Sequence, residues 1–280
     1  MSALEKLGRS IEKRRQLTYA RRRLAMRPHP LSFYSDKLAA GEAFSFSRFG
    51  DGEWDAIFRR PGANADAHEY FPELGARLAA ALEARPPYYI GLQNHALKYD
   101  GRRIADWLNE RAIRGPFHNA DVFGFANVLG TLGPFIAHLR RRPVAMIGPP
   151  HLRGIDHVFP YERYFEVPAV NCFLEADTIT RELRAFGAGR TGVVYAFSAS
   201  MAANVMIHDL HPELGAENWL LDLGSIWDVY MGVRSRGWFR QLDLGPAMDR
   251  NRGVPPSRQP GRRLRELLVL ASNRRHVRTD

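Results

Sequence analysis

Short apolar runs alternate with segments of helical periodicity along most of this 280-residue chain. Several runs are continuously apolar, which is typical of parallel strands that are covered on both faces. The strand-like runs are residues 43–49, 87–92, 122–126, 143–148, 165–170, 192–197 and 219–223. Helical spacing occupies most of the intervals, at residues 71–84, 102–114, 132–142, 176–186 and 199–210. This order predicts an α/β domain with a mostly parallel sheet flanked by helices.

The net charge of +10 is concentrated at the two ends of the chain. Residues 1–30 and residues 250–280 each contain nine Lys or Arg and two Asp or Glu, so the residues between them carry about −4. A stretch rich in Pro, Gly and Arg, DRNRGVPPSRQPG, begins at Asp249 and indicates the end of the compact domain. We therefore assign a basic N-terminal helical extension (1–30), a central domain (31–248) and a basic C-terminal tail (249–280).

The basic ends leave three interpretations open. The first is a solvated helix and tail. The second is peripheral attraction to an anionic membrane surface, worth about 1 kcal/mol for each basic side chain near it. Nucleic acid is less favoured, because neither end interleaves aromatic residues with its arginines as a stacking platform would.

Several classes of protein lack their usual sequence marks. Cys172 is the only cysteine, so a disulfide framework or a cysteine zinc site within one chain is excluded. The N-terminus has no apolar signal-peptide core, and no stretch reaches 18 uninterrupted apolar residues, so we expect a cytoplasmic protein. The motifs G-x-S-x-G, G-x-G-x-x-G, H-E-x-x-H and the Walker A loop are absent, which argues against serine hydrolases, dehydrogenases, zincins and P-loop proteins.

Polar side chains follow most of the predicted strands. In an open α/β sheet, ligands bind at the carboxyl ends of the strands, where loops lead into helices. The sequence therefore predicts a ligand site that draws on several of these loops. The loops are residues 48–53, 93–95, 148–151, 198–200 and 222–225.

The first of these loops, RFGDGE, has two possible explanations. Asp-Gly between apolar runs is a hairpin signal, and the alternation of Phe and Ser before it predicts a half-buried strand. Helical spacing of Trp54, Ile57 and Phe58 instead indicates a strand–loop–helix unit. The pattern alone leaves both open, but the chemistry favours a metal site. Two carboxylates separated by one glycine offer the hard oxygen ligands that Mg²⁺ or Mn²⁺ prefers, and an arginine can donate to the same phosphates.

Residues 47–53, SRFGDGE, resemble the signature of the GT-D type of glycosyltransferases, a bacterial family with a Rossmann-like domain and a D-x-E metal motif. The resemblance implies that Asp51 and Glu53 bind Mn²⁺ or Mg²⁺ across the diphosphate of a nucleotide sugar. It also assigns nearby loop residues to nucleotide-sugar binding: Arg48, Phe49, Gly50 and Gly52. The similarity covers roughly residues 33–232, through weaker segments at residues 120–123, 144–149, 167–172, 193–210 and 221–230.

The chain departs from this family at two places. It has Ser198-Ala199-Ser200 where members tend to have Gly-Pro, and Gly224-Ser225 where they tend to have Gly-His. We therefore transfer no catalytic base from the family.

The remaining candidates come from their position at the ligand edge. Asp222 and Asp228 are candidates for a catalytic base or an acceptor ligand, with a helix cap or salt bridge as the alternative, and Ser225 is expected to be an N-cap. Asn94, His95 and Ser198 are assigned to the nucleotide sugar, and His151 is a further candidate for substrate contact.

These observations predict a metal-dependent glycosyltransferase. The expected donor is a nucleotide-diphosphate sugar, a UDP-hexose above all, and the expected acceptor is a glycan or glycoprotein in bacterial surface polysaccharide synthesis. Two alternatives remain. The same acid pair could serve a metal-dependent phosphohydrolase, and the arginine-rich ends could serve a nucleic-acid-binding protein.

Overall fold

The computed structural model describes residues 3–236 and 242–254, and these residues form a seven-stranded sheet in which every pairing is parallel. The strand order is β3-β2-β1-β7-β6-β4-β5, so the last strand lies beside the first. The predicted α/β class with a mostly parallel sheet is confirmed. The strands are β1 (Ser45–Phe49), β2 (Tyr89–Leu92), β3 (Phe117–Asn119), β4 (Val144–Gly148), β5 (Arg163–Glu166), β6 (Val194–Phe197) and β7 (Trp219–Asp222).

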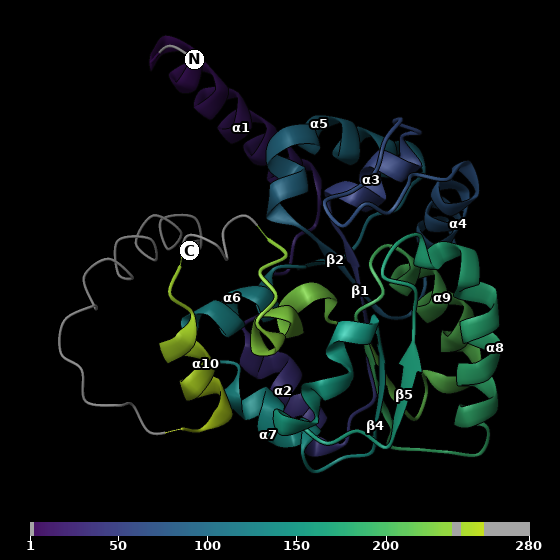
Figure 1. Cartoon of the computed structure of the whole chain (residues 1–280). Helices are drawn as coiled ribbons and strands as arrows, with labels where there is room; N and C mark the ends of the chain where they lie inside the picture. Colours follow the sequence, from purple (N-terminus) through teal and green to yellow (C-terminus); the bar gives the residue numbers. More distant parts are fainter. Residues whose placement is uncertain (1–2, 237–241, 255–280) are drawn as a thin grey trace.

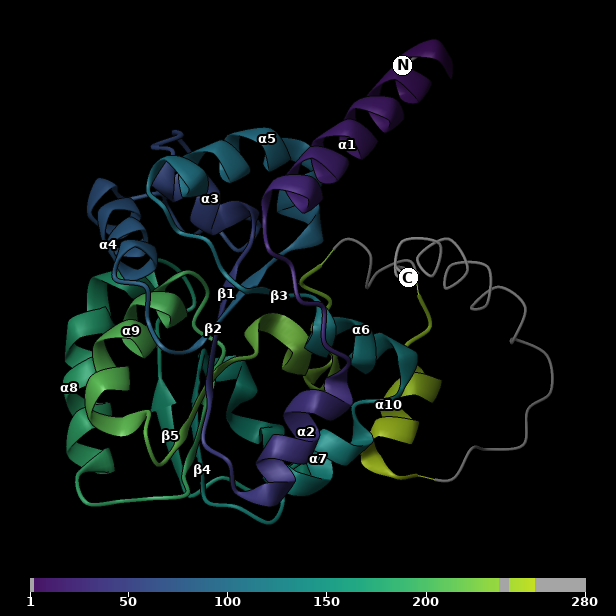
Figure 2. The same ribbon diagram turned by 180° about the vertical axis from the view of Figure 1, so that it is seen from behind.

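Helices cover both faces of the sheet and bury one apolar core on each face (Figures 1 and 2). On one face lie α3 (Asp51–Ile57), α4 (Pro72–Glu83), α5 (Asn94–Glu110), the short 3₁₀ helix η2 (Cys172–Glu175), α8 (Ala176–Gly187) and α9 (Ala202–Leu214), with α1 (Ala3–Arg23) packed against α5. On the other lie α2 (Leu31–Ala40), α6 (Val122–Leu129), α7 (Gly133–Leu139), the 3₁₀ helices η1 (Pro150–His157) and η3 (Gly224–Met231), and α10 (Gly245–Arg252).

The central strand β1 is buried on both faces. Phe46 enters the core on one face, and Phe49 enters the core on the other. Ser45 and Ser47 are each 1% exposed, so the expectation of a half-buried strand was wrong. The reason is that α9 covers this face, and Ser47 Oγ hydrogen-bonds the side chain of the fully buried Asn204 on that helix.

Three element predictions differ from the structure, and one strand was not predicted. Residues 122–126 form the start of α6 and not a strand, because Val122, Phe123 and Ala126 have the spacing of one buried helix face. A short apolar run does not distinguish a strand from a buried helix. The strand of this region is the three-residue β3. Helix α5 begins at residue 94 and not at 102, with a non-helical residue at Asp100, and β5 ends at residue 166.

The two basic ends differ in how they meet the domain. The C-terminal half of α1 is docked, since Leu17 and Ala20 are buried and Tyr19 Oη donates to Asp106 at 2.7 Å. The N-terminal half is exposed and projects from the body (Figure 1). At the other end, the boundary predicted at residue 248 falls inside α10, which packs on α6 and α7. The rest of the predicted tail, from residue 255, lies outside the described residues.

Of the helices in residues 3–236 and 242–254, none is by itself long and apolar enough to cross a membrane. Helices α6 and α7 would meet that criterion only as a pair, and they are bent by 109° at the break between them. Both contribute fully buried side chains to the core, among them Phe123 and Phe135.

Helices α1 and α5 approach closely at a glycine, which gives a test of how α1 is docked. A Cβ atom at Gly101 would lie 2.5 Å from the carbonyl oxygen of Gln16, so Gly101→Ala should push the helices apart and cost about 1–3 kcal/mol. Gly8→Ala in the exposed half of α1 meets nothing within 4 Å and should stabilise the helix by up to about 1 kcal/mol. Urea denaturation of both variants measures the difference, and equal midpoints would contradict the docked position of α1.

Candidate functional site

The carboxyl ends of β1 and β7 border a topological switch point. After β1 the chain enters α3 on one face, and after β7 it enters η3 on the other. In open α/β sheets ligands usually bind at such a point, and we refer to the carboxyl edge between β1 and β7 as the crevice. Because the strands are parallel, the predicted polar loops leave the sheet at this one edge: residues 48–53, 93–95, 148–151, 198–200 and 222–225.

Arg48 spans the crevice. Its Nε donates to the carbonyl oxygen of Ala120 at 3.1 Å, and its Nη1 lies 3.8 Å from Oδ1 of the buried Asp222. Gly224 packs against the guanidinium with a φ of +56°, and a Cβ there would overlap Nη1 of Arg48. A glycine is therefore required both by the backbone angle and by the close approach. These contacts hold the arginine at the end of β1.

The GDGE segment is not a hairpin turn, because α3 begins at Asp51 directly after the strand. Gly50 is the N-cap residue, and Glu53 Oε2 accepts a hydrogen bond from the Gly50 backbone N–H at 2.7 Å. The other oxygen, Oε1, accepts from Nδ2 of Asn204 at 3.4 Å. Gly52 is buried, and a Cβ there would lie 3.2 Å from the sulfur of Met201. The loop thus presents Asp51 outwards and holds Glu53 inwards.

The carboxyl groups of the crevice are poorly neutralised. The pKa of Glu53 is raised to about 7, first by burial and then by the charge of Asp222, while the hydrogen bond from Gly50 opposes the shift. Burial raises the pKa of Asp222 to about 6 against the lowering effect of Arg48. Each raised pKa means that the folded protein holds the charged form of the group at a cost in free energy. A bound cation would remove part of that cost.

Asp51 and Glu53 are chemically suited to a hard divalent cation. The Asp51 side chain is 67% exposed, so its oxygens are open to a ligand. Within the part of the chain that the structure describes, no three His, Cys, Asp or Glu side chains are grouped so that they could hold a metal ion by themselves. A cation here would take its other ligands from phosphate oxygens and water, as Mg²⁺ commonly does.

The nucleotide-sugar candidates outside this loop fall into different environments. Asn94 is committed to the protein, because its backbone N–H and its Nδ2 both donate to Asp121 Oδ2 at 3.0 Å. His95 is exposed, and its Nε2 lies 3.9 Å from Oδ2 of Asp51. Ser198 is buried at the end of β6, and its hydroxyl has no hydrogen-bond partner among the described residues. His95 is therefore open to a ligand, the Ser198 hydroxyl is buried without a partner among the described residues, and Asn94 shapes the loop.

Phe49 does not have the predicted nucleotide-sugar contact. Its side chain is 1% exposed and packs beside Trp54, with ring centroids 6.1 Å apart. Alternation along the strand places it opposite to Arg48, so the ring faces the core. Ser225 is not an N-cap either, since η3 begins one residue earlier, and the Gly224 N–H donates to Asp222 Oδ1 at 3.0 Å.

Asp228 is buried and lies one turn further along η3, with both carboxylate oxygens engaged. His151 Nε2 lies 3.0 Å from Oδ1, and Ser235 Oγ donates to Oδ2 at 2.5 Å. The adjacent Arg236 donates to both carboxylate oxygens of Asp66 at 2.6 and 2.7 Å. Burial acts to lower the pKa of Arg236, but Asp66, followed by the charges of Asp228 and Asp51, raises it.

Sequence reasoning missed Asn204, Arg236 and the contact between His151 and Asp228. A signal existed for Asn204, which is the one amide in the apolar start of α9, AANVMI. Nothing local in the sequence marks Arg236 or joins residue 151 to residue 228, because each contact links distant segments.

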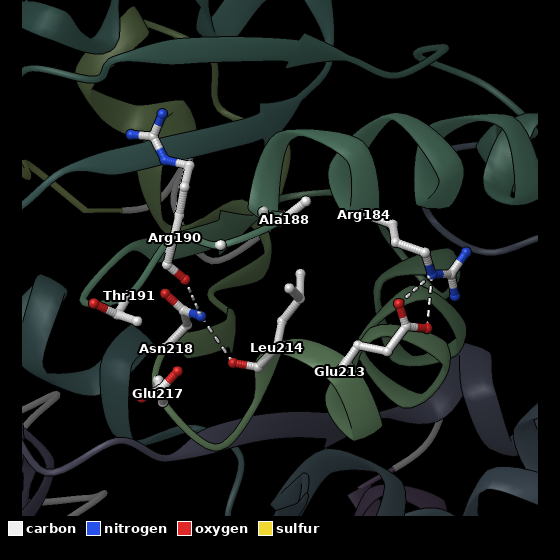
Figure 3. Close-up of a pocket in the computed structure, with 10 residues that line it drawn as sticks. Arg184, Ala188, Arg190, Thr191, Glu213, Leu214, Glu217 and Asn218 are labelled. Atoms are coloured by element: carbon white, nitrogen blue, oxygen red, sulfur yellow. Dashed lines mark hydrogen bonds and ion pairs between the residues drawn. The ribbon is translucent and has the colours of Figure 1, made fainter.

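A surface cavity of about 240 Å³ lies away from this site (Figure 3). Its lining comes from the segments that precede β6 and β7, which is the opposite edge of the sheet. Arg184 is paired with Glu213, and Arg190 is paired with Glu162. The cavity therefore offers no unpaired arginine to an anionic ligand, and the chemistry points to the carboxyl edge.

Comparison with known proteins identifies the fold. The sequence matches no protein-family model and no curated protein. Two solved structures match the fold: a selenomethionine-substituted domain of unknown function 1792 (TM-score 0.59), and a structure whose authors describe that domain as having a distinct glycosyltransferase fold (TM-score 0.57). Each is 16% identical to this protein in sequence. The matched region covers 78% of this chain and 86% of the solved chain. The expected Rossmann-like fold of the GT-D type is confirmed.

The raised pKa of Asp222 predicts a pH-dependent stability. Its folded pKa of about 6 exceeds the ordinary value, so the stability associated with the protonated group is present at low pH and is lost as the pH rises through 6. Asp222→Asn keeps the size of the side chain and should raise the free energy of unfolding by about 2–3 kcal/mol at pH 8. Most of the difference should vanish at pH 4. Urea denaturation at both pH values checks this, and a variant less stable than wild type at pH 8 would show that the Arg48 pair outweighs burial.

Proposed function

We propose that this protein is a metal-dependent glycosyltransferase that transfers a hexose from a nucleotide-diphosphate sugar, with a UDP-hexose as the donor. The observation that carries the proposal is that Arg48, Asp51 and Glu53 follow one another at the end of β1, beside the switch point. The same fold occurs in a domain that is described as having a distinct glycosyltransferase fold. Fold likeness alone does not assign an activity, so the proposal depends on the chemistry of these residues.

The diphosphate would be bound by groups that the fold already holds in place. Asp51 and Glu53 would hold Mn²⁺ or Mg²⁺, which when bound supplies charge neutralisation for the leaving diphosphate. Arg48 would donate to phosphate oxygens from the position fixed by Ala120 and Gly224. Its guanidinium stays charged throughout the reaction, so it can stabilise charge that develops as the sugar–phosphate bond breaks.

Two further residues suit the donor. His95 is exposed beside Asp51, where it could donate to a phosphate or a ribose hydroxyl. Ser198 has a buried hydroxyl without a partner in the described part of the chain, and a sugar hydroxyl could provide one. His95 follows β2 and Ser198 follows β6, at the same edge of the sheet on either side of β1 and β7.

The proposed setting is bacterial surface polysaccharide or glycoprotein synthesis in the cytoplasm, with a glycan or glycoprotein acceptor. The exposed half of α1 supports peripheral contact with the anionic inner leaflet, because Lys6, Arg9, Lys13 and Arg14 lie on it beside exposed Leu7 and Ile11.

Calorimetric titration of UDP tests the donor site. With Mn²⁺ present, wild type should bind UDP, and EDTA should abolish the binding. The double variant Asp51→Ala/Glu53→Gln should bind UDP at least tenfold more weakly, because it lacks both of the carboxylates that would hold the cation. Glutamine at position 53 retains an acceptor for the Gly50 N–H, so the start of α3 is preserved.

Asp36→Ala is the matched control, since Asp36 is an exposed carboxylate on α2, remote from the carboxyl edge. It should bind UDP as wild type does. Wild-type protein that binds no UDP with Mn²⁺ would overturn the proposal. Release of phosphate from simple phosphoesters, or salt-sensitive binding of nucleic acid, would then identify one of the alternatives.

A pair of glycines separates backbone strain from the position of Arg48. Gly224 and Gly232 both have positive φ, +56° and +74°, but a Cβ at Gly232 meets nothing within 4 Å. Alanine at either position should lower stability through backbone strain, and only Gly224→Ala should also displace Arg48. We expect at least a tenfold loss of UDP affinity for Gly224→Ala and less than a twofold change for Gly232→Ala, by the same calorimetry. Equal affinities would show that Arg48 does not contact the diphosphate.

A further inference from the structure

A histidine and a buried carboxylate meet where η1 packs against η3. His151 Nε2 lies 3.0 Å from Oδ1 of Asp228. The Asp228 side chain is 8% exposed, and the His151 side chain is 36% exposed. One partner is therefore sheltered, and the other reaches solvent. No step proposed so far uses this pair.

The hydrogen bonds fix which ring nitrogen is free. Ser235 Oγ donates to the second oxygen of Asp228, so the buried carboxylate is held at both ends. Beside an ionised carboxylate, which only accepts, a neutral His151 ring has its hydrogen on Nε2 and its lone pair on Nδ1. A histidine oriented by a carboxylate in this way is a common arrangement for a general base.

The pair belongs to the same edge of the sheet as the diphosphate site. His151 comes three residues after the end of β4, and η3 begins at Gly224, the residue that packs against Arg48. Arg236 follows Ser235, which hydrogen-bonds Asp228, and the charges of Asp228 and Asp51 both act on Arg236. The pair is on the η3 side of the crevice, and the acids are on the α3 side.

We propose that His151 is the catalytic base that deprotonates the acceptor hydroxyl, and that Asp228 is its positioning residue. This rests on the proposed function. The acceptor oxygen forms a bond to the anomeric carbon as the bond from that carbon to the diphosphate oxygen breaks. The bonding electron pair leaves with the nucleoside diphosphate, and the acceptor proton moves to Nδ1 of His151.

A stereochemical consequence follows. A single displacement that is assisted by a base on the acceptor side inverts the anomeric centre, as base-assisted attack does in inverting glycosidases. The product should therefore have the opposite anomeric configuration to the donor. A product with the donor's configuration would overturn the role of His151.

The first test locates the pair without requiring turnover. Long-range ¹H–¹⁵N spectra of the histidine rings, assigned with His151→Gly, should show His151 with its hydrogen on Nε2. Asp228→Asn should weaken that preference, which loss of packing alone would not do. Addition of UDP with Mn²⁺ should broaden the ring signals of His151 more than those of His157, at the far end of η1. Equal broadening would place the pair away from the donor and overturn the proposal.

The second test is kinetic and uses UDP-glucose and UDP-galactose with Mn²⁺, with water as the acceptor. His151→Gly should lower kcat by about 10²–10⁴-fold with KM and UDP affinity within twofold of wild type, and added imidazole should restore part of the rate. Asp228→Asn should lower kcat by less. His157→Gly is the matched control on the same helix and should keep wild-type kinetics, because His157 is exposed and its Nδ1 hydrogen-bonds the Gly154 carbonyl oxygen within η1.

The outcomes separate the two proposals. Wild-type UDP binding and turnover with an unaffected His151→Gly variant would overturn the base and leave the glycosyltransferase proposal intact. Wild-type protein that binds no UDP would overturn both.

Discussion

The side-chain amide of Asn204 holds together the point at which the sheet opens. Strand β7 pairs with β1 only as far as Phe46, whereas β2 pairs with it to Phe49, so one side of β1 is left without a neighbour near Arg48. A buried backbone donor without a partner is costly. Asn204 Oδ1 accepts from the Arg48 N–H at 3.0 Å and bonds the Ser47 hydroxyl, while Nδ2 reaches Glu53. One fully buried side chain thus provides the hydrogen bond that β7 does not give to β1 at Arg48. It also links this part of β1 to Glu53 at the start of α3.

The architecture could be predicted from the sequence because it depends on local patterns. Continuous apolar runs and helical spacing gave the parallel sheet, and the sheet in turn gave the edge at which the polar loops gather. The misassignment of residues 122–126 has a physical reason, since a five-residue apolar run satisfies a buried helix as well as a strand. The strand of that region, β3, has three residues, of which one, Phe117, is a large apolar side chain.

The site was predictable only where its residues are close in the sequence. The segment 48–53 could be identified as a unit, although Phe49 was misplaced because strand alternation turns it into the core. The Arg48–Asp222 and His151–Asp228 contacts each join segments that only the strand order brings together. The pKa values of the site could not be predicted from the sequence pattern either, because those of Glu53 and Asp222 are raised through burial by residues on other elements.

The position of β7 has a consequence for how the protein is made. The strand that is translated last of the seven is inserted between β1 and β6, and it joins the two halves of the sheet. While the chain emerges from the ribosome, β1–β3 and β4–β6 have no direct pairing with one another, and the long-range contact that connects them comes late and slowly. The crevice is completed by the same event. A partly synthesised chain therefore lacks the assembled crevice, and Arg48 and Asp222 come together only after nearly the whole sheet has closed.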